Sequence, residues 1–172
     1  MAASSQTVKK VAMELGGNAP FLVLSDANVD EAVKGAMLAK MRNGGAACTA
    51  ANRFYVAKKV ATEFTSKLTA AMSGLKMAPG LTEGAQLGAS VSVKERNKIA
   101  ELVDSAVSAG GKVETGAKLP ETQGAFYPAT VLTVEKNNPI LQQEVFGPVA
   151  PIVVIESDEE AIALANATEF GL

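Results

Sequence analysis

Hydrophobic residues occur along the chain in two kinds of run that alternate. Short continuous apolar runs, typical of strands covered on both faces, lie at 21–24 and 149–155, and the stretch 53–57, which begins with Arg53, is also a predicted strand. Between and after them, apolar residues recur three or four positions apart, as on one face of a helix. These helical sets are Val29, Val33, Ala36, Met37 and Met41; Val60, Phe64, Leu68 and Met72; Ile99, Leu102, Val103 and Ala106; and Ala161, Leu164 and Ala165. The alternation predicts an α/β domain with a largely parallel sheet.

Capping signals indicate where these helices begin and end. Asn28 is a predicted N-cap with Glu31 at the third helical position, and the pairs Ser92/Glu95 and Ser157/Glu160 form capping boxes. The glycines in stretches 43–45 and 109–111 and at position 171 are expected at helix C-termini. A short strand at 112–115 and a longer extended segment at 126–134 complete the pattern.

Composition narrows the class of protein. With 172 residues and 48% hydrophobic content, the chain can bury one core, and one domain is expected. A net charge of −2 gives no basic surface for nucleic acid. No apolar run is long enough to cross a bilayer, and the one cysteine excludes an internal disulfide. We therefore expect a cytoplasmic protein with neither a nucleic-acid nor a membrane partner.

The chain contains no histidine, which restricts its possible chemistry most of all. Nucleophile pairs of the Ser-His and Cys-His kinds are excluded, and no metal site is expected. Any general base must be Asp, Glu, Lys or Tyr. If the chain is part of an enzyme, we expect it to pair a thiol with a carboxylate. No glycine-rich Rossmann fingerprint or P-loop is present to bind phosphates.

The one cysteine, Cys48, lies among small residues between a predicted helix and a predicted strand. Small neighbours allow a flat ligand or a backbone to approach its sulfur. On local sequence alone, an inert buried thiol is the favoured interpretation, because most free cysteines are of that kind.

Three segments change that interpretation. They are Met13-Glu14-Leu15-Gly16-Gly17-Asn18, the loop around Cys48, and Gln143-Glu144-Val145-Phe146-Gly147-Pro148. In this order and spacing they resemble three motifs of the aldehyde dehydrogenase superfamily, and the resemblance extends over nearly the whole chain. The stretches 40–45 and 51–53 are most similar to the succinate-semialdehyde dehydrogenase branch. The resemblance implies a three-layer α/β/α catalytic domain of aldehyde dehydrogenase type.

The resemblance also implies roles for individual residues. Cys48 would be the nucleophile that adds to the aldehyde carbon, with its own backbone N–H as an oxyanion donor. Glu14 would activate water to hydrolyse the thioester, and Arg42 would bind the distal carboxylate of the substrate. The implied contacts to the cofactor, NAD or NADP, are Glu144, Phe146, Leu15 and Gly16, although Gly16 also suits a purely geometric role.

Each of these residues has a simpler alternative. Arg42 can be an arginine that interacts with the dipole at a helix C-terminus, and Glu14 can be an exposed surface carboxylate. Glu144 and Phe146 can be a capping carboxylate and a core aromatic. Two positions also depart from the family: Ala46 stands where a glutamine is common, and Ala50 stands where some members carry a second, redox-active cysteine.

Residues 1–172 are expected to form a partial catalytic domain, with the Rossmann NAD(P)-binding domain outside this chain. The implied reaction is oxidation of succinic semialdehyde to succinate by a homodimeric or homotetrameric enzyme, and the chain alone is expected not to turn over. Two alternatives stay open. One is an aldehyde dehydrogenase with another small aldehyde as substrate, and the other is a non-catalytic assembly module.

Overall fold

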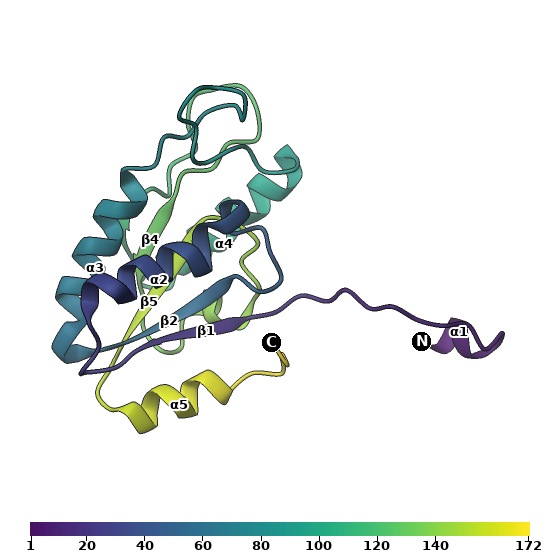
Figure 1. Ribbon diagram of the computed structural model, residues 1–172, viewed down its shortest axis with the longest axis horizontal. Helices are drawn as coiled ribbons and strands as arrows, with labels where there is room; N and C mark the ends of the chain where they lie inside the picture. The colour runs from purple at the N-terminus through teal and green to yellow at the C-terminus, as the bar shows by residue number, and fades with distance from the viewer.

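The computed structural model describes all residues, 1–172, and contains one five-stranded sheet in the order β1-β2-β5-β4-β3 (Figure 1). Neighbouring strands pair in parallel except at the β3 edge, where β3 and β4 are antiparallel. This confirms the predicted α/β class with a largely parallel sheet. The strands are β1 (Ala19–Val23), β2 (Ala51–Ala57), β3 (Lys112–Thr115), β4 (Thr130–Thr133) and β5 (Val149–Ile155).

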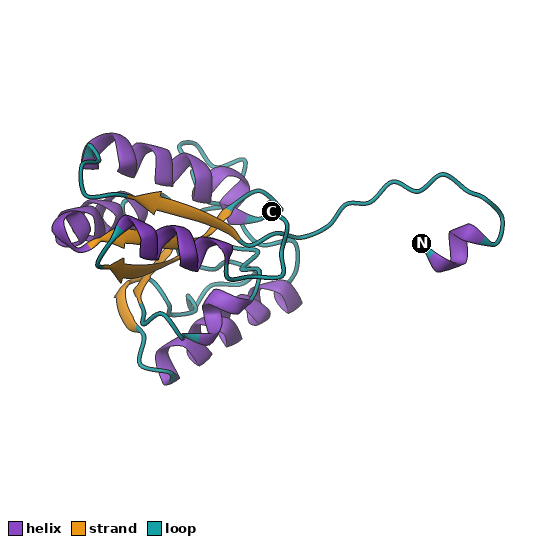
Figure 2. Ribbon diagram, turned by 90° about the horizontal axis from the view of Figure 1, so that it is seen from below, coloured by secondary structure: helices purple, strands orange, loops and turns teal.

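Helices lie on both sides of the sheet (Figure 2). Alternate residues of β2 contact the helices on opposite sides. The ring of Phe54 packs against Phe21 on the side of α2, with 5.4 Å between ring centroids. Arg53 and Tyr55 point to the other side. There, both reach the carbonyl of Leu164 in α5. The arrangement has three layers. The helices are α1 (Ala2–Ser5), α2 (Val29–Met41), α3 (Lys58–Ser73), α4 (Val93–Ser108) and α5 (Asp158–Asn166), with 3-10 turns η1 (Arg42–Gly45) and η2 (Pro139–Gln142).

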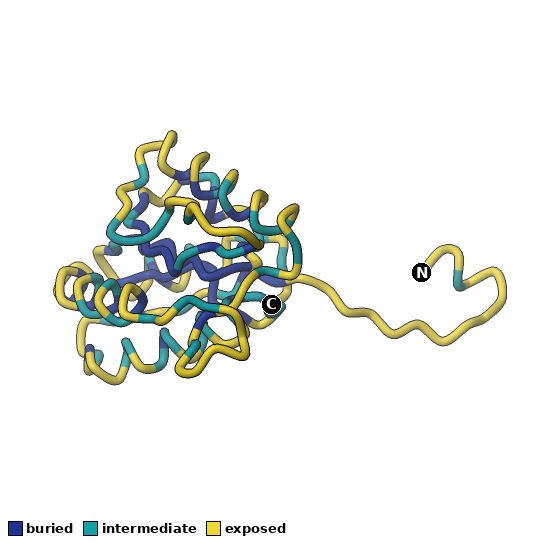
Figure 3. Tube along the Cα trace, turned by 90° about the horizontal axis from the view of Figure 1, so that it is seen from above, coloured by how far each residue is buried: buried dark blue, intermediate teal, exposed yellow.

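One cluster of 31 buried apolar residues lies between these layers (Figure 3). The predicted face of α3 is fully represented in it, since Val60, Phe64, Leu68 and Met72 are all buried. Burying a side chain of this kind contributes roughly 1.5–3 kcal/mol. None of the helices is both long enough and apolar enough to cross a membrane.

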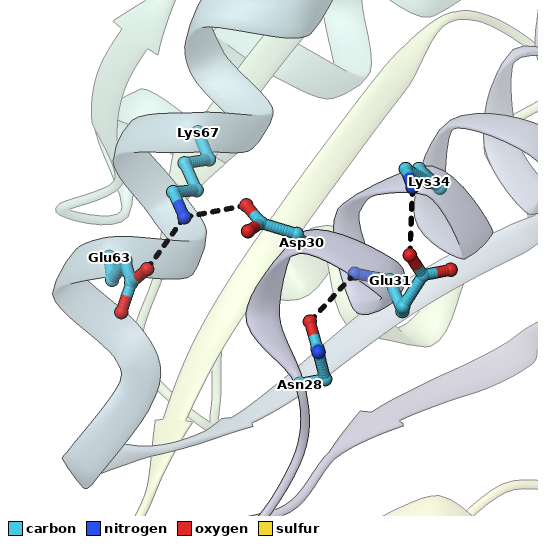
Figure 4. A network of polar contacts seen from close by, with 6 residues as sticks. All are labelled: Asn28, Asp30, Glu31, Lys34, Glu63 and Lys67. Carbon is cyan, nitrogen blue, oxygen red and sulfur yellow. Dashed lines mark hydrogen bonds and ion pairs between the residues drawn. The ribbon is translucent and has the colours of Figure 1, made fainter.

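The predicted helix starts are confirmed. Asn28, Ser92 and Ser157 each accept a hydrogen bond from the N–H three residues later. On the surface, Lys67 of α3 pairs with Asp30 of α2 as well as with Glu63 (Figure 4). Such exposed pairs contribute on the order of 0–1 kcal/mol, so they orient α2 against α3 rather than hold the fold together.

Several predicted boundaries are wrong. The last helix ends at Asn166 with Ala167 as C-cap, not at Gly171, because the chain then turns back and the carbonyl of Leu172 accepts the N–H of Asn18 at 2.7 Å. Helix α2 ends at Met41, so its C-cap is Arg42 rather than a glycine. Only Thr130–Thr133 of segment 126–134 forms a strand; Pro128 has no N–H to donate to a ladder.

Residues 1–16 are almost entirely exposed and run away from the sheet, with the short, unpredicted helix α1 at their far end (Figures 1 and 3). This segment, called the arm below, enters the domain at the amino end of β1.

Candidate active site

The three motif segments lie at one edge of the sheet. Segment 13–18 directly precedes β1, the loop 46–50 precedes β2, and segment 143–148 precedes β5. Because β1, β2 and β5 are successive parallel neighbours, their amino ends lie side by side. Segments more than 120 residues apart in sequence are therefore brought together.

Gly17 is the point where the segments touch. Its N–H donates to Oε1 of Glu144 at 3.2 Å, which joins the first segment to the third. A Cβ added at Gly17 would lie 2.6 Å from the carbonyl oxygen of Cys48, so only glycine allows the first segment to approach the cysteine loop. A Cβ at Gly16 would collide with the carboxylate of Glu144. Gly17 thus has a geometric reason to lack a side chain, because its obstacle is backbone, whereas the flexible carboxylate of Glu144 can turn away from a side chain at Gly16.

Cys48 is half-buried in a tight turn. The N–H of Ala50 donates to the carbonyl of Ala47 at 3.0 Å, and the side chain of Asn43 donates to the carbonyl of Ala46 at 2.8 Å. The backbone N–H of Cys48 donates to no backbone carbonyl. A thiol beside an unused N–H can attack a carbonyl carbon while the N–H stabilises the oxyanion that forms.

Glu144 and Phe146 line a cleft of about 480 Å³ between segment 143–146 and α4. The α4 side contributes Glu95 and Lys98, which form an ion pair at 2.8 Å. Phe146 is 46% exposed and is therefore not a core residue, so its ring is available to a ligand. Carboxylates that can accept hydroxyl hydrogen bonds, together with an accessible aromatic face, fit the ribose and the flat ring of a nicotinamide nucleotide.

A second cleft of about 540 Å³ lies beside Phe146 and Pro148, between η1 and the loop 86–91. Tyr127 contributes to its wall and is buried. Burial raises the pKa of the Tyr127 hydroxyl above its ordinary value, with a smaller contribution from Asp104. That hydroxyl stays protonated and is unsuited to act as a base.

The structure does not bring Glu14 or Arg42 into this cluster of contacts. Glu14 lies on the arm and is exposed, and Leu15 is 67% exposed beside it. Arg42 is exposed at the C-terminus of α2 and forms no ion pair with a carboxylate of the chain. The side chains of Glu14 and Arg42 are therefore accessible to a ligand.

Sequence reasoning missed a set of buried polar side chains behind the site: Asn18, Lys40, Asn52 and Arg53. Nε of Arg53 donates to the carbonyl of Asn18 at 2.8 Å, and its two terminal nitrogens donate to Leu164 and Ala165. The signal was present in the pattern. Lys40 continues the spacing of Val29, Val33 and Ala36 along one face of α2, and Arg53 interrupts an otherwise apolar strand.

The aldehyde dehydrogenase family model matches residues 1–172. The chain belongs to the aldehyde dehydrogenase family. It is 50% identical to succinate-semialdehyde dehydrogenase of Paenarthrobacter nicotinovorans, over 100% of this chain and 38% of that protein. It is 45% identical to glutarate-semialdehyde dehydrogenase of Pseudomonas putida, over 98% of this chain and 35% of that protein.

Among solved structures, the chain is similar to succinate-semialdehyde dehydrogenase from Burkholderia pseudomallei, with a TM-score of 0.95 and 43% identity. The match covers 99% of this chain and 36% of that one. The chain therefore spans between a third and two fifths of the length of the relatives that it matches, and it shares the fold of this part of them.

Proposed function

We propose that this chain carries the acylation and deacylation half of an NAD(P)-dependent aldehyde dehydrogenase. One observation carries the proposal: Gly17 touches both the carbonyl of Cys48 and the carboxylate of Glu144, which joins the proposed nucleophile to the proposed cofactor cleft. A non-catalytic assembly module would need neither contact.

In the proposed reaction, the thiolate of Cys48 adds to the aldehyde carbon and gives a thiohemiacetal, whose oxyanion the Cys48 N–H stabilises. NAD+ or NADP+, when bound, would supply the acceptor for the hydride that the thiohemiacetal carbon loses as it becomes a thioester. Glu14 then takes a proton from water, which attacks the thioester carbon and releases the acid and the free thiol. Glu144 and Phe146 hold the cofactor, with Leu15 and Gly16 beside them.

The substrate we propose is a small aldehyde with a distal carboxylate, most specifically succinic semialdehyde. The relatives named above act on such aldehydes, as their names state. Arg42 is exposed, unpaired, and six residues before Cys48, so its guanidinium can form a bidentate bond to a carboxylate. A neutral aldehyde remains the second candidate.

Since the chain spans little more than a third of its relatives, we propose that turnover requires residues outside it, including a Rossmann domain that binds most of the cofactor. We further propose a cytoplasmic homodimer or homotetramer as the complete enzyme. Detectable NADH or NADPH formation from succinic semialdehyde by the 172-residue chain alone would contradict the first of these proposals.

The experiment that tests the half-site is hydrolysis of p-nitrophenyl acetate, which needs no cofactor. We expect the wild-type chain to release p-nitrophenol, Cys48→Ala to lose release, and Glu14→Gln to keep the initial burst while its steady-state rate falls. Glu121 is an exposed carboxylate in the loop between β3 and β4, so Glu121→Gln is the matched control and should behave as wild type. Equal rates for Cys48→Ala and wild type would show that the thiol is inert in this chain.

A further inference from the structure

Lys40 is fully buried, yet no carboxylate lies within hydrogen-bonding or salt-bridge distance of its amino group. Its Nζ donates to Oδ1 of Asn52 at 2.9 Å and to the carbonyl of Val145 at 3.2 Å. A buried lysine bonded only to neutral acceptors is rare, because removing an ammonium from water is costly. The side chain therefore needs a reason beyond filling space.

The hydrogen-bond partners of Lys40 connect it to the motif segments. Val145 stands next to Glu144 in the third motif segment, and Nδ2 of Asn52 donates to the carbonyl of Gly17 in the first segment at 3.2 Å. The side chain of Lys40 also lies against Gly45, in the turn before Cys48. A Cβ added at Gly45 would be 3.2 Å from Cε of Lys40. The amino group of Lys40 thus joins the first and third segments, directly or through one amide, and its stem packs against the turn that leads into the second.

We propose that Lys40 is the positioning residue that holds the three segments in register, and that gain or loss of its proton changes how it holds them. The significance for catalysis rests on the function proposed above, whereas the contacts and the titration do not.

Burial lowers the pKa of Lys40 to about 7, against an ordinary value of 10.5, and the negative charge of Glu144 partly offsets that lowering. Other cations lie away from it: Arg53 points to the opposite face of β2, and Arg42 is exposed past the end of α2. The chain has no histidine, the side chain that ordinarily titrates in this range. A transition in the site near pH 7 that disappears when Lys40 is replaced is therefore attributable to Lys40.

The test is a pH titration of the ¹⁵N-labelled chain, followed by amide NMR. We expect the signals of Gly17, Gly45 and Val145 to shift between about pH 6 and 8 with one shared midpoint near 7. Gly80 and Gly110, where an added Cβ would have no neighbour within 4 Å, serve as internal references and should not share that midpoint.

Two variants separate the proposal from a merely structural role. Lys40→Met should abolish the shared shift, while Lys34→Met, on an exposed turn of the same helix, should keep it. Site signals that stay constant from about pH 6 to 8, or a shift that survives in Lys40→Met, overturn the proposal.

If Lys40→Met does not fold, ¹³C-lysine labelling of the wild type decides the matter. One ε-methylene signal titrating near pH 7 is the expected result, and all lysines titrating above about pH 9 is the contrary one. None of these readouts requires enzymatic turnover, so a failure here is distinguishable from a failure of the proposed reaction.

Discussion

Gly17 and Cys48 approach each other so closely that a methyl group does not fit between them: a Cβ on Gly17 would lie 2.6 Å from the carbonyl oxygen of Cys48. The obstacle is backbone, which cannot rotate away. The cysteine loop and the first motif segment must therefore keep this spacing as a unit.

Gly17→Ala is accordingly expected to lower the free energy of unfolding by about 1–3 kcal/mol, because the added methyl overpacks a closed contact. It should also lower the rate of p-nitrophenyl acetate hydrolysis, since the loop carrying Cys48 must move. Urea denaturation and the ester assay measure the two effects. Gly88→Ala is the control, with nothing within 4 Å of its Cβ position, and a loss of stability there as large as at Gly17 would contradict the explanation.

Arg53 is expected to anchor the first segment to the sheet. Its guanidinium donates to three carbonyls, those of Asn18, Leu164 and Ala165, from a buried position. Lysine cannot reach all three, so Arg53→Lys should remove the arginine hydrogen bond from the carbonyl of Asn18 or Ala165, at a cost of about 1–3 kcal/mol, whereas the carbonyl of Leu164 keeps the Tyr55 hydroxyl as a donor. Chemical denaturation measures this loss. Arg96 on α4 is only partly buried, so Arg96→Lys should change stability by less than about 0.5 kcal/mol.

The buried amino group of Lys40 makes stability depend on pH. Its folded-state pKa of about 7 lies below the ordinary value of 10.5, so the unfolded chain binds the extra proton between these values. The cost of burying the charge is fully present below pH 7 and is relieved as pH rises toward 10.5. At about 1.4 kcal/mol per pH unit, the difference in unfolding free energy between wild type and Lys40→Met should change by at most about 5 kcal/mol across that window.

Denaturant titrations of both proteins at several pH values measure this difference, and groups common to the two cancel. We expect the free energy of unfolding of the wild type to increase relative to that of Lys40→Met as pH rises from 7. A constant difference from pH 6 to 10 would mean that Lys40 keeps its charge, and the proposed titration of the site would fall with it.

The sequence pattern predicted elements well where one period dominates. The four-residue spacing of Val60, Phe64, Leu68 and Met72 could only be satisfied by a helix with one buried face, and α3 has that face. Strand 149–155 was likewise unambiguous. The order of strands was not accessible, because β5 inserts beside β2 from nearly a hundred residues away and no local pattern specifies that pairing.

The unknown strand order also limited the prediction of the site. The motifs predicted which segments form the site, but only the strand order explains why these segments meet, and they meet at the amino ends of the strands. In most open parallel sheets, ligands bind at the carboxyl ends, so topology alone would have favoured the wrong edge. Lys40 was missed for a related reason. Its spacing placed it on the buried face of α2, yet a lysine has a place there only because Asn52 and Val145, which lie outside that helix, accept its hydrogen bonds.

We expect Arg42 to decide which aldehyde the complete enzyme prefers. A bidentate, charge-assisted bond to a distal carboxylate stabilises it by about 1.5–3 kcal/mol, so Arg42→Ala should lower kcat/KM for succinic semialdehyde by roughly 10- to 100-fold. For a neutral aldehyde of the same length, such as butanal, the loss should be less than about twofold, because no partner for the guanidinium exists.

Arg42→Lys separates charge from geometry in the same assay. Lysine keeps the positive charge but not the two parallel donors, so its kcat/KM for succinic semialdehyde should fall between those of wild type and Arg42→Ala. The test needs the complete enzyme and steady-state kinetics with both aldehydes. Equal losses for the charged and the neutral substrate would assign Arg42 to the end of α2, as a cation that interacts with the helix dipole, and would leave the substrate without a carboxylate contact in this chain.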